Sequence, residues 1–141
     1  MPVHLIKLAV GVRDIEHLAE LQQGRQYYRE GILIVPGFTR RRPRRPEEVT
    51  DGGSIYWVIK GVIRCRQRVL DFETVVGDDG ISWCRLILDP TLIRTVPEPK
   101  KAFQGWRYLD PATAPRDLDA RTGEGELPAH LLAELRDLGL A

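Results

Sequence analysis

Five arginines crowd one short segment of the chain and are its first candidates for binding chemistry. They lie within residues 40–46, which also hold two prolines, and they are Arg40, Arg41, Arg42, Arg44 and Arg45. Unpaired guanidinium groups at this density attract polyanions, because each phosphate they neutralise releases counterions. The same run would also suit a solvated loop whose arginines pair with Glu47, Glu48 and Asp51 downstream. Both interpretations stay open at this point.

A second basic group follows the period of a strand. Arg64, Arg66 and Arg68 alternate with apolar or neutral residues, and Lys60 lies shortly before them. A period of two places such side chains on one face of a strand. Three like charges in a row need acidic neighbours on an adjacent strand or an anionic ligand. The functional interpretation is a basic face beside the arginine-rich loop, suited to a nucleic-acid backbone.

A third candidate combines aromatic and polar residues late in the chain. Aromatic rings beside arginine can stack on unpaired bases, although such residues more often belong to a core. Trp57 and Trp83, inside apolar strands, are expected to be packing residues. If the later residues converged with an acid, a small-molecule or nucleotide-processing pocket would result. Its members would be Gly61, Gln104, Trp106, Arg107 and Asp117.

The remaining reactive residue types form no enzyme or metal signature. Neither serine, at 54 or 82, stands in a nucleophile-elbow context, and the histidines at 4, 17 and 130 are scattered. We therefore expect no catalytic residues, no metal site and no cofactor. Cys65 and Cys84 both fall inside apparent strands, and we expect two reduced thiols that pack as small apolar residues.

Composition and charge favour one soluble cytoplasmic domain spanning residues 1–141. The chain is 43% hydrophobic and 29% charged, and its apolar runs are too short for a membrane span. The net charge of +1 hides a split, since residues 1–70 hold 13 basic and 7 acidic residues, and residues 71–141 hold 8 and 13. This asymmetry indicates a basic surface carried by the first half. The chain also uses 17 arginines and only four lysines, which either phosphate recognition or a GC-rich genome would explain.

Hydrophobic periodicity predicts a mixed α and β chain. Strands are expected at 3–10, 32–35, 54–60, 62–76, 81–88 and 91–96, with a turn and a short strand within 100–109. Helices are expected from Asp14 to about Tyr28 and at 130–138. The apolar set in 62–76 changes phase after Val69, which indicates a β-bulge. Residues 77–80 form a hairpin turn, and about 38–53 form an exposed, mobile loop. The predicted fold is α+β, a small bent, mostly antiparallel β-barrel with a helix near each end.

Several segments resemble a bacterial family known as a domain of unknown function (number fourteen eighty-nine). The resemblance rests on Val3–Leu8, Tyr56–Gly61, Phe103–Leu109 and Ala114–Leu118, and it covers nearly the whole chain. It implies family membership without an established activity.

A second resemblance concerns the fold. Gly61 and Arg68 match the ends of the G-x-K-x-x-E-x-R motif of ASCH domains, in the pseudouridine-synthase-and-archaeosine-transglycosylase (PUA)-like group. Ile63 and Arg66 stand where the motif has Lys and Glu, so half of the pattern is absent. The resemblance implies a small bent β-barrel and binding of RNA or modified bases.

The leading hypothesis is thus a non-enzymatic module that contacts RNA or another nucleic acid through the arginine-rich loop and the basic strand face. One alternative is an enzyme with a pocket near Trp106, Arg107 and Asp117. The other is a protein-interaction module in which the basic loop meets the acidic half of another chain. The sequence does not determine the oligomeric state.

Overall fold

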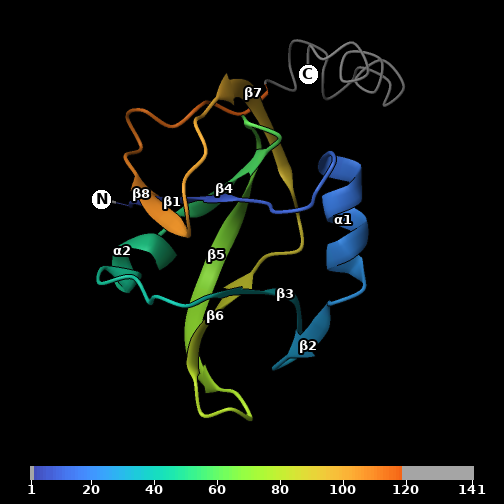
Figure 1. Cartoon of the computed structure of the whole chain (residues 1–141), viewed down its shortest axis with the longest axis vertical. Coiled ribbons are helices and arrows are strands. Elements are labelled where there is room, and N and C mark those ends of the chain that lie inside the picture. The colour runs from blue at the N-terminus through green and yellow to red at the C-terminus, as the bar shows by residue number, and fades with distance from the viewer. Residues whose placement is uncertain (1, 119–141) are drawn as a thin grey trace.

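The computed structural model describes residues 2–118, and these form two helices and eight strands (Figure 1). In chain order the elements are β1 (His4–Leu8), α1 (Ile15–Gln23), β2 (Tyr27–Arg29), β3 (Ile32–Thr39), α2 (Pro46–Thr50), β4 (Ser54–Ile59), β5 (Val62–Val76), β6 (Ser82–Leu88), β7 (Ile93–Pro99) and β8 (Trp106–Leu109). The strands form one mixed sheet in the order β2-β3-β6-β5-β4-β1-β8, with β7 also paired to β5. The sheet is bent, but it does not close into the predicted barrel.

The long strand β5 organises the sheet and runs through the middle of the molecule (Figure 1). Its first half lies between β4 and β7, and its second half pairs with β6 to form the predicted hairpin. The register shifts between Val69 and Asp71, where the sequence predicted a bulge. A second shift leaves Arg64 without a register partner on β4. Ile63 and Cys65 therefore point to opposite faces of the sheet, although a strict period of two would place both on one face.

Strand β1 lies between two strands that are distant in sequence. It runs parallel to β4, where Leu5 pairs with Ile55, and antiparallel to β8, where Leu5 pairs with Tyr108. All other strand pairs are antiparallel in the described residues, so the prediction of a mostly antiparallel sheet is confirmed.

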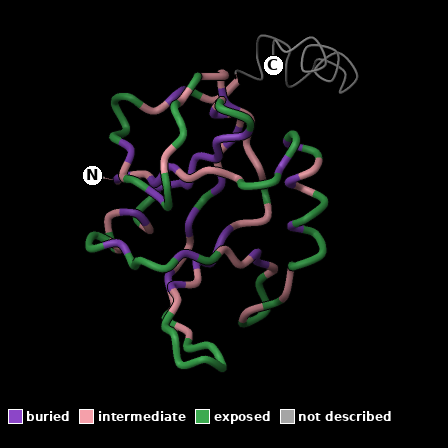
Figure 2. The backbone as a smooth tube through the Cα atoms, viewed as in Figure 1, coloured by how far each residue is buried: buried purple, intermediate pink, exposed green. Residues whose placement is uncertain are grey.

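The bent sheet carries a core on each face. The larger core gathers residues of β1, β4, β5, β6 and α1, including Leu5, Trp57 and Leu88. The smaller core, on the other face, contains Ile6, Tyr56 and Leu109. Alternation along β1 and β4 sends neighbouring side chains to opposite faces, which explains why β4 is almost wholly apolar and why Leu5 and Ile6 of β1 belong to different cores. Figure 2 shows this buried centre and the exposed tip of the β5–β6 hairpin.

Helix α1 is shorter than predicted. Asp14 caps it as expected, since its carboxylate accepts the His17 backbone N–H at 2.7 Å. The helix ends at Gln23, before Gly24, and residues 27–29 pair with β3 as an additional strand. The predicted helix at 130–138 lies outside the described residues.

The predicted ends of secondary-structure elements are wrong at three places that contain proline. Strand β3 continues through Pro36 and Gly37 to Thr39, and β7 includes Pro97 and Pro99, which the sequence suggested would end it. Proline is tolerated in a strand where its missing N–H faces away from a partner strand. The predicted loop at 38–53 also contains the end of β3 and the short helix α2, which starts at Pro46.

Both cysteines are buried and reduced, as predicted. Burial raises the pKa of the Cys65 thiol to about 12, so almost none of it is ionised at pH 8. Because the thiolate is the reactive form, we expect neither cysteine of the native protein to react with dithionitrobenzoate within minutes. Addition of denaturant should release two thiols. Fast reaction of a thiol in the folded protein would contradict this packing.

Candidate nucleic-acid interface

The arginine-rich segment 40–45 is docked against β8. The Arg41 guanidinium donates to the Trp106 carbonyl at 3.1 Å, and the Trp106 indole N–H donates back to the Arg41 carbonyl at 2.8 Å. The Arg41 Cζ atom lies 4.2 Å from the centre of the indole ring. The Arg45 backbone N–H donates to the Tyr108 hydroxyl at 3.0 Å. These contacts fix the segment in place, contrary to the mobile loop that the sequence predicted.

Only one of the five arginines of this segment is neutralised by an acid of the described chain. Arg45 forms a two-pronged ion pair with Glu48, at 2.6 and 2.8 Å. Arg40 and Arg42 instead lie over aromatic rings, with Cζ at 4.9 Å from the centre of Trp83 and 5.9 Å from that of Phe72. Stacking on a ring orients a guanidinium but leaves its charge in place. Among residues 2–118, an acid therefore neutralises only Arg45 of this segment, by way of Glu48.

Beside this segment, Lys7 and the tryptophans on either side of it form the floor of a surface. On three adjacent strands, Lys7 pairs in register with Trp57 on one side and with Trp106 on the other. Burial lowers the pKa of Lys7. Lys7 makes no ion pair with the described residues, so its charge is open to an external anion.

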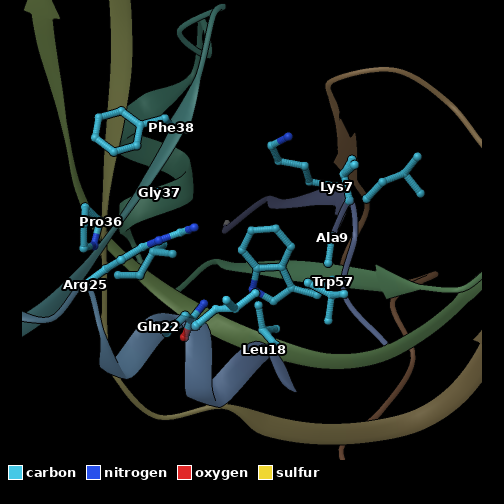
Figure 3. Close-up of a pocket in the computed structure, with 14 residues that line it drawn as sticks. Lys7, Ala9, Leu18, Gln22, Arg25, Pro36, Gly37, Phe38 and Trp57 are labelled. Atoms are coloured by element: carbon cyan, nitrogen blue, oxygen red, sulfur yellow. The ribbon is translucent and has the colours of Figure 1, made fainter. Parts of the chain in front are cut away.

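Two adjoining cavities, of about 250 and 380 Å3, open above this floor and share Lys7 and Phe38. The first lies between α1 and the ends of β1 and β3, and the second lies beside Arg40, Arg41 and Trp83. We call the two together the groove. In Figure 3 the Trp57 indole stands between Lys7 and Gln22, with Arg25 and Phe38 on the other wall. Four cations line the groove, namely Lys7, Arg25, Arg40 and Arg41, and no acid does so among the described residues.

A buried hydrogen-bond network fixes the end of the groove beneath α1. The Gln67 side chain is fully buried, and its Oε1 accepts both the Trp57 indole N–H at 3.0 Å and Gln22 Nε2–H at 2.9 Å. Its Nε2 donates to Gln22 Oε1 at 2.8 Å and to the Asp89 carbonyl at 2.7 Å. Because an indole only donates and a carbonyl only accepts, these partners determine the orientation of both amides. The network therefore holds Trp57 and α1 rigidly together.

The basic strand face lies on the other side of the sheet. Arg66 forms a two-pronged pair with Asp117, at 2.7 and 2.8 Å, and donates to the Ser54 hydroxyl. Arg68 and Lys60 are exposed, and Lys60 lies in the β4–β5 turn with Gly61. Because Gln67 points toward the groove, its neighbours Arg66 and Arg68 point away from it. The two predicted basic groups thus do not form one continuous surface.

The predicted pocket near Trp106, Arg107 and Asp117 is not formed either. Gln104 and Trp106 line the groove, whereas Arg107 follows Trp106 on the strand and lies over the Phe103 ring, 4.9 Å from its centre. Asp117 is engaged by Arg66 on the opposite face. Residues adjacent on a strand face opposite ways, so Trp106 is separated from Arg107 and Asp117, which both lie on the face away from the groove.

The sequence analysis missed three residues of the groove, namely Lys7, Arg25 and Phe38. Lys7 lies in β1, Phe38 in β3 and Arg25 in the turn after α1. A signal was available for two of them: Lys7 interrupts an apolar strand, and Phe38 is an aromatic ring beside the arginine run. Phe38 is 50% exposed, which is unusual for a ring on a strand of a packed sheet.

Comparison with protein families gives one match. A family model described as a protein of unknown function (DUF1489) matches residues 5–141. The chain belongs to the DUF1489 family. No curated protein and no solved structure gives a significant match to this DUF1489 chain.

None of the helices within residues 2–118 is both long and apolar enough to cross a membrane. The same residues hold no cluster of three or more His, Cys, Asp or Glu side chains that could bind a metal ion.

Proposed function

We propose that this protein binds single-stranded nucleic acid, RNA in the first place, along the groove. The observation that carries the proposal is a pair of adjoining cavities lined by four cations and several aromatic rings, with no acid in the lining. Cations neutralise phosphates, and aromatic faces stack on bases whatever the sequence. The combination suits a strand whose backbone and bases are both accessible.

The placement of Phe38 favours a single strand over a duplex. Its half-exposed ring stands where the two cavities meet, so a base must leave its neighbours to lie on it. Bases in a duplex keep both faces covered, whereas those in loops and single strands can splay onto aromatic rings. We infer that the smaller cavity, of about 250 Å3 beside α1, takes a single base.

The rest of the proposal concerns the kind of protein. We infer a non-enzymatic binding module of the cytoplasm with a PUA-like half-barrel. Support for the fold comes from the bent sheet and the bulged strand β5, together with Gly61 and Arg68 of the ASCH motif.

The experiment is a salt titration of binding to fluorescein-labelled single-stranded RNA by anisotropy. Replacing Arg40 and Arg41 with Gln should lower affinity and flatten the slope of log K against log salt. Loss of two phosphate contacts, at ~0.7 each for single strands, predicts a slope smaller by about 1.4. Phe38→Ala should lower affinity ~5-fold or more with the slope unchanged, because stacking carries no charge.

The matched control is Lys60→Gln with Arg68→Gln, which removes the same charge from two exposed residues that do not line the groove. It should leave both affinity and slope nearly unchanged. If both double variants weaken binding equally, the attraction is diffuse and the groove is not the site. No binding even at low salt would exclude the nucleic-acid proposal and favour the two alternatives, a small-molecule enzyme or a protein-interaction module.

A further inference from the structure

A third cavity, of about 360 Å3, opens on the face of the sheet opposite the groove. It lies between β1, β4, β5 and the segment 111–117, and its polar lining comes from His4, Tyr56, Arg66, Arg116 and Asp117. Nothing in the proposed binding of nucleic acid uses it. The described chain places three hydrogen-bonding groups here without giving them partners.

The first of these groups is the Tyr56 hydroxyl. Tyr56 is only 4% exposed, yet its hydroxyl has no hydrogen-bond partner among the described residues. The oxygen is not sealed in, unlike the unpartnered hydroxyl of Tyr27, and it faces the cavity. The ring is buried but its hydroxyl opens on the cavity without an acceptor from the described residues, so a ligand that accepts this O–H would supply one.

The second group is the outer nitrogen of His4. Its Nδ1 accepts the Ser54 backbone N–H at 3.0 Å, so the proton of the neutral ring is on Nε2. Burial and the charge of Arg66 lower the pKa of His4, which keeps the ring neutral at pH 7. Its ring packs edge-on against that of Tyr56, with centres 5.0 Å apart. His4 therefore presents Nε2–H as a donor, and its ring lines the cavity together with Tyr56.

The charges around the cavity leave a positive excess. Asp117 neutralises Arg66, and the pair is held by the Ser54 hydroxyl. Arg116 is exposed and makes no ion pair with the described residues. A neutral phenol, a neutral imidazole and one guanidinium that no acid within residues 2–118 pairs with together present donors and a single positive charge.

We propose that this cavity binds a small oxyanion, a phosphate monoester or a carboxylate, through Tyr56, His4 and Arg116. Such an anion only accepts hydrogen bonds, which matches a lining whose free groups all donate. The fixed Arg66–Asp117 pair forms the floor and orients Ser54, which in turn fixes the His4 ring. The site lies on a different face from the groove, so it does not depend on whether the groove binds nucleic acid.

The test is an NMR titration of the full chain with inorganic phosphate, methyl phosphate and acetate, each at constant ionic strength. We expect saturable shifts of the His4 imidazole and Tyr56 ring signals, with His17 as the internal reference. Stronger binding of methyl phosphate than of acetate identifies a phosphate monoester, and the reverse identifies a carboxylate. A 5′-phosphorylated dinucleotide beside its dephosphorylated form shows whether the phosphate can belong to a nucleic-acid end.

Tyr56→Phe removes only the hydroxyl and should weaken binding at least 5-fold. The control is Tyr27→Phe, which removes another buried, unpartnered hydroxyl outside the cavity and should leave the titration unchanged. Arg116→Gln, on an exposed side chain, should also weaken binding and gives an answer even if Tyr56→Phe does not fold. The proposal would be overturned if none of the three anions gave saturable shifts of His4. It would also be overturned if Tyr56→Phe and Arg116→Gln both bound the anion as tightly as the unchanged protein does.

Discussion

Replacing Gln67 with leucine should lower the free energy of unfolding by about 3–5 kcal/mol. The side chain is fully buried and satisfies the Trp57 indole N–H, the Asp89 carbonyl and the Gln22 amide together. Leucine fills a similar volume but leaves these three groups without their partner. Each buried polar group left unpaired costs about 1–3 kcal/mol. Urea unfolding followed by tryptophan fluorescence measures the loss.

A double-mutant cycle separates the network from simple packing. Removing both amides, in Gln22→Leu with Gln67→Leu, takes away one unpaired group and should cost less than the sum of the single variants by at least ~1 kcal/mol. Gln23→Leu, on an exposed residue at the end of α1, controls for the chemistry of the change and should stay within about 0.5 kcal/mol. Additive single effects would show that the amides act separately and that no network exists.

Gly53→Ala should destabilise the fold by about 3 kcal/mol or more, or prevent folding. Gly53 joins α2 to β4, and its N–H donates to the Val49 carbonyl at 2.7 Å. A Cβ atom here would overlap the carbonyl oxygens of Val3 and Val49, which are backbone atoms and cannot turn aside. The chain would have to separate β1 from α2. Thermal unfolding by circular dichroism measures the effect.

Gly24→Ala is the matched control for this substitution. Gly24 ends α1 with ordinary helical angles, and its added Cβ would lie 3.6 Å from the nearest atom, the Leu21 carbonyl oxygen. We expect a small gain of stability, about 0.4–1 kcal/mol, because alanine restricts the unfolded chain. A Gly53→Ala protein as stable as Gly24→Ala would mean that the α2–β4 junction is not packed as described.

The features predicted best are those that depend on residues close together in the sequence. The ends of β5, its bulge after Val69 and its hairpin with β6 all follow from apolar alternation and a Gly-Asp-Asp-Gly turn. The bulge at Arg64 was missed because apolar Ile63 and Cys65 fit either face when both faces carry a core. Helix α2 was missed because five residues are too few for a helical period to be visible.

The candidate site was predicted only in part, for a related reason. The arginine run could be recognised as exposed and cationic, but its docking depends on Trp106 and Tyr108, more than sixty residues away. Lys7 becomes part of the groove because β1 is inserted beside β4 and β8, a pairing that no local pattern encodes. Arg66 could be identified as needing an acid, but which acid, Asp117, is a property of the fold.

The position of β1 also determines when the groove can come into existence during synthesis. Its floor combines residue 7 with residue 106. Strand β1 is synthesised first, but it can pair on both sides only after β4 and then β8 have been synthesised. Pairings between distant residues are slow to form. A nascent chain that has not yet exposed β8 has no Lys7–Trp106 floor and no anchor for its arginines. If the groove binds nucleic acid as proposed, a partly made chain will not bind it until β8 has been synthesised and paired.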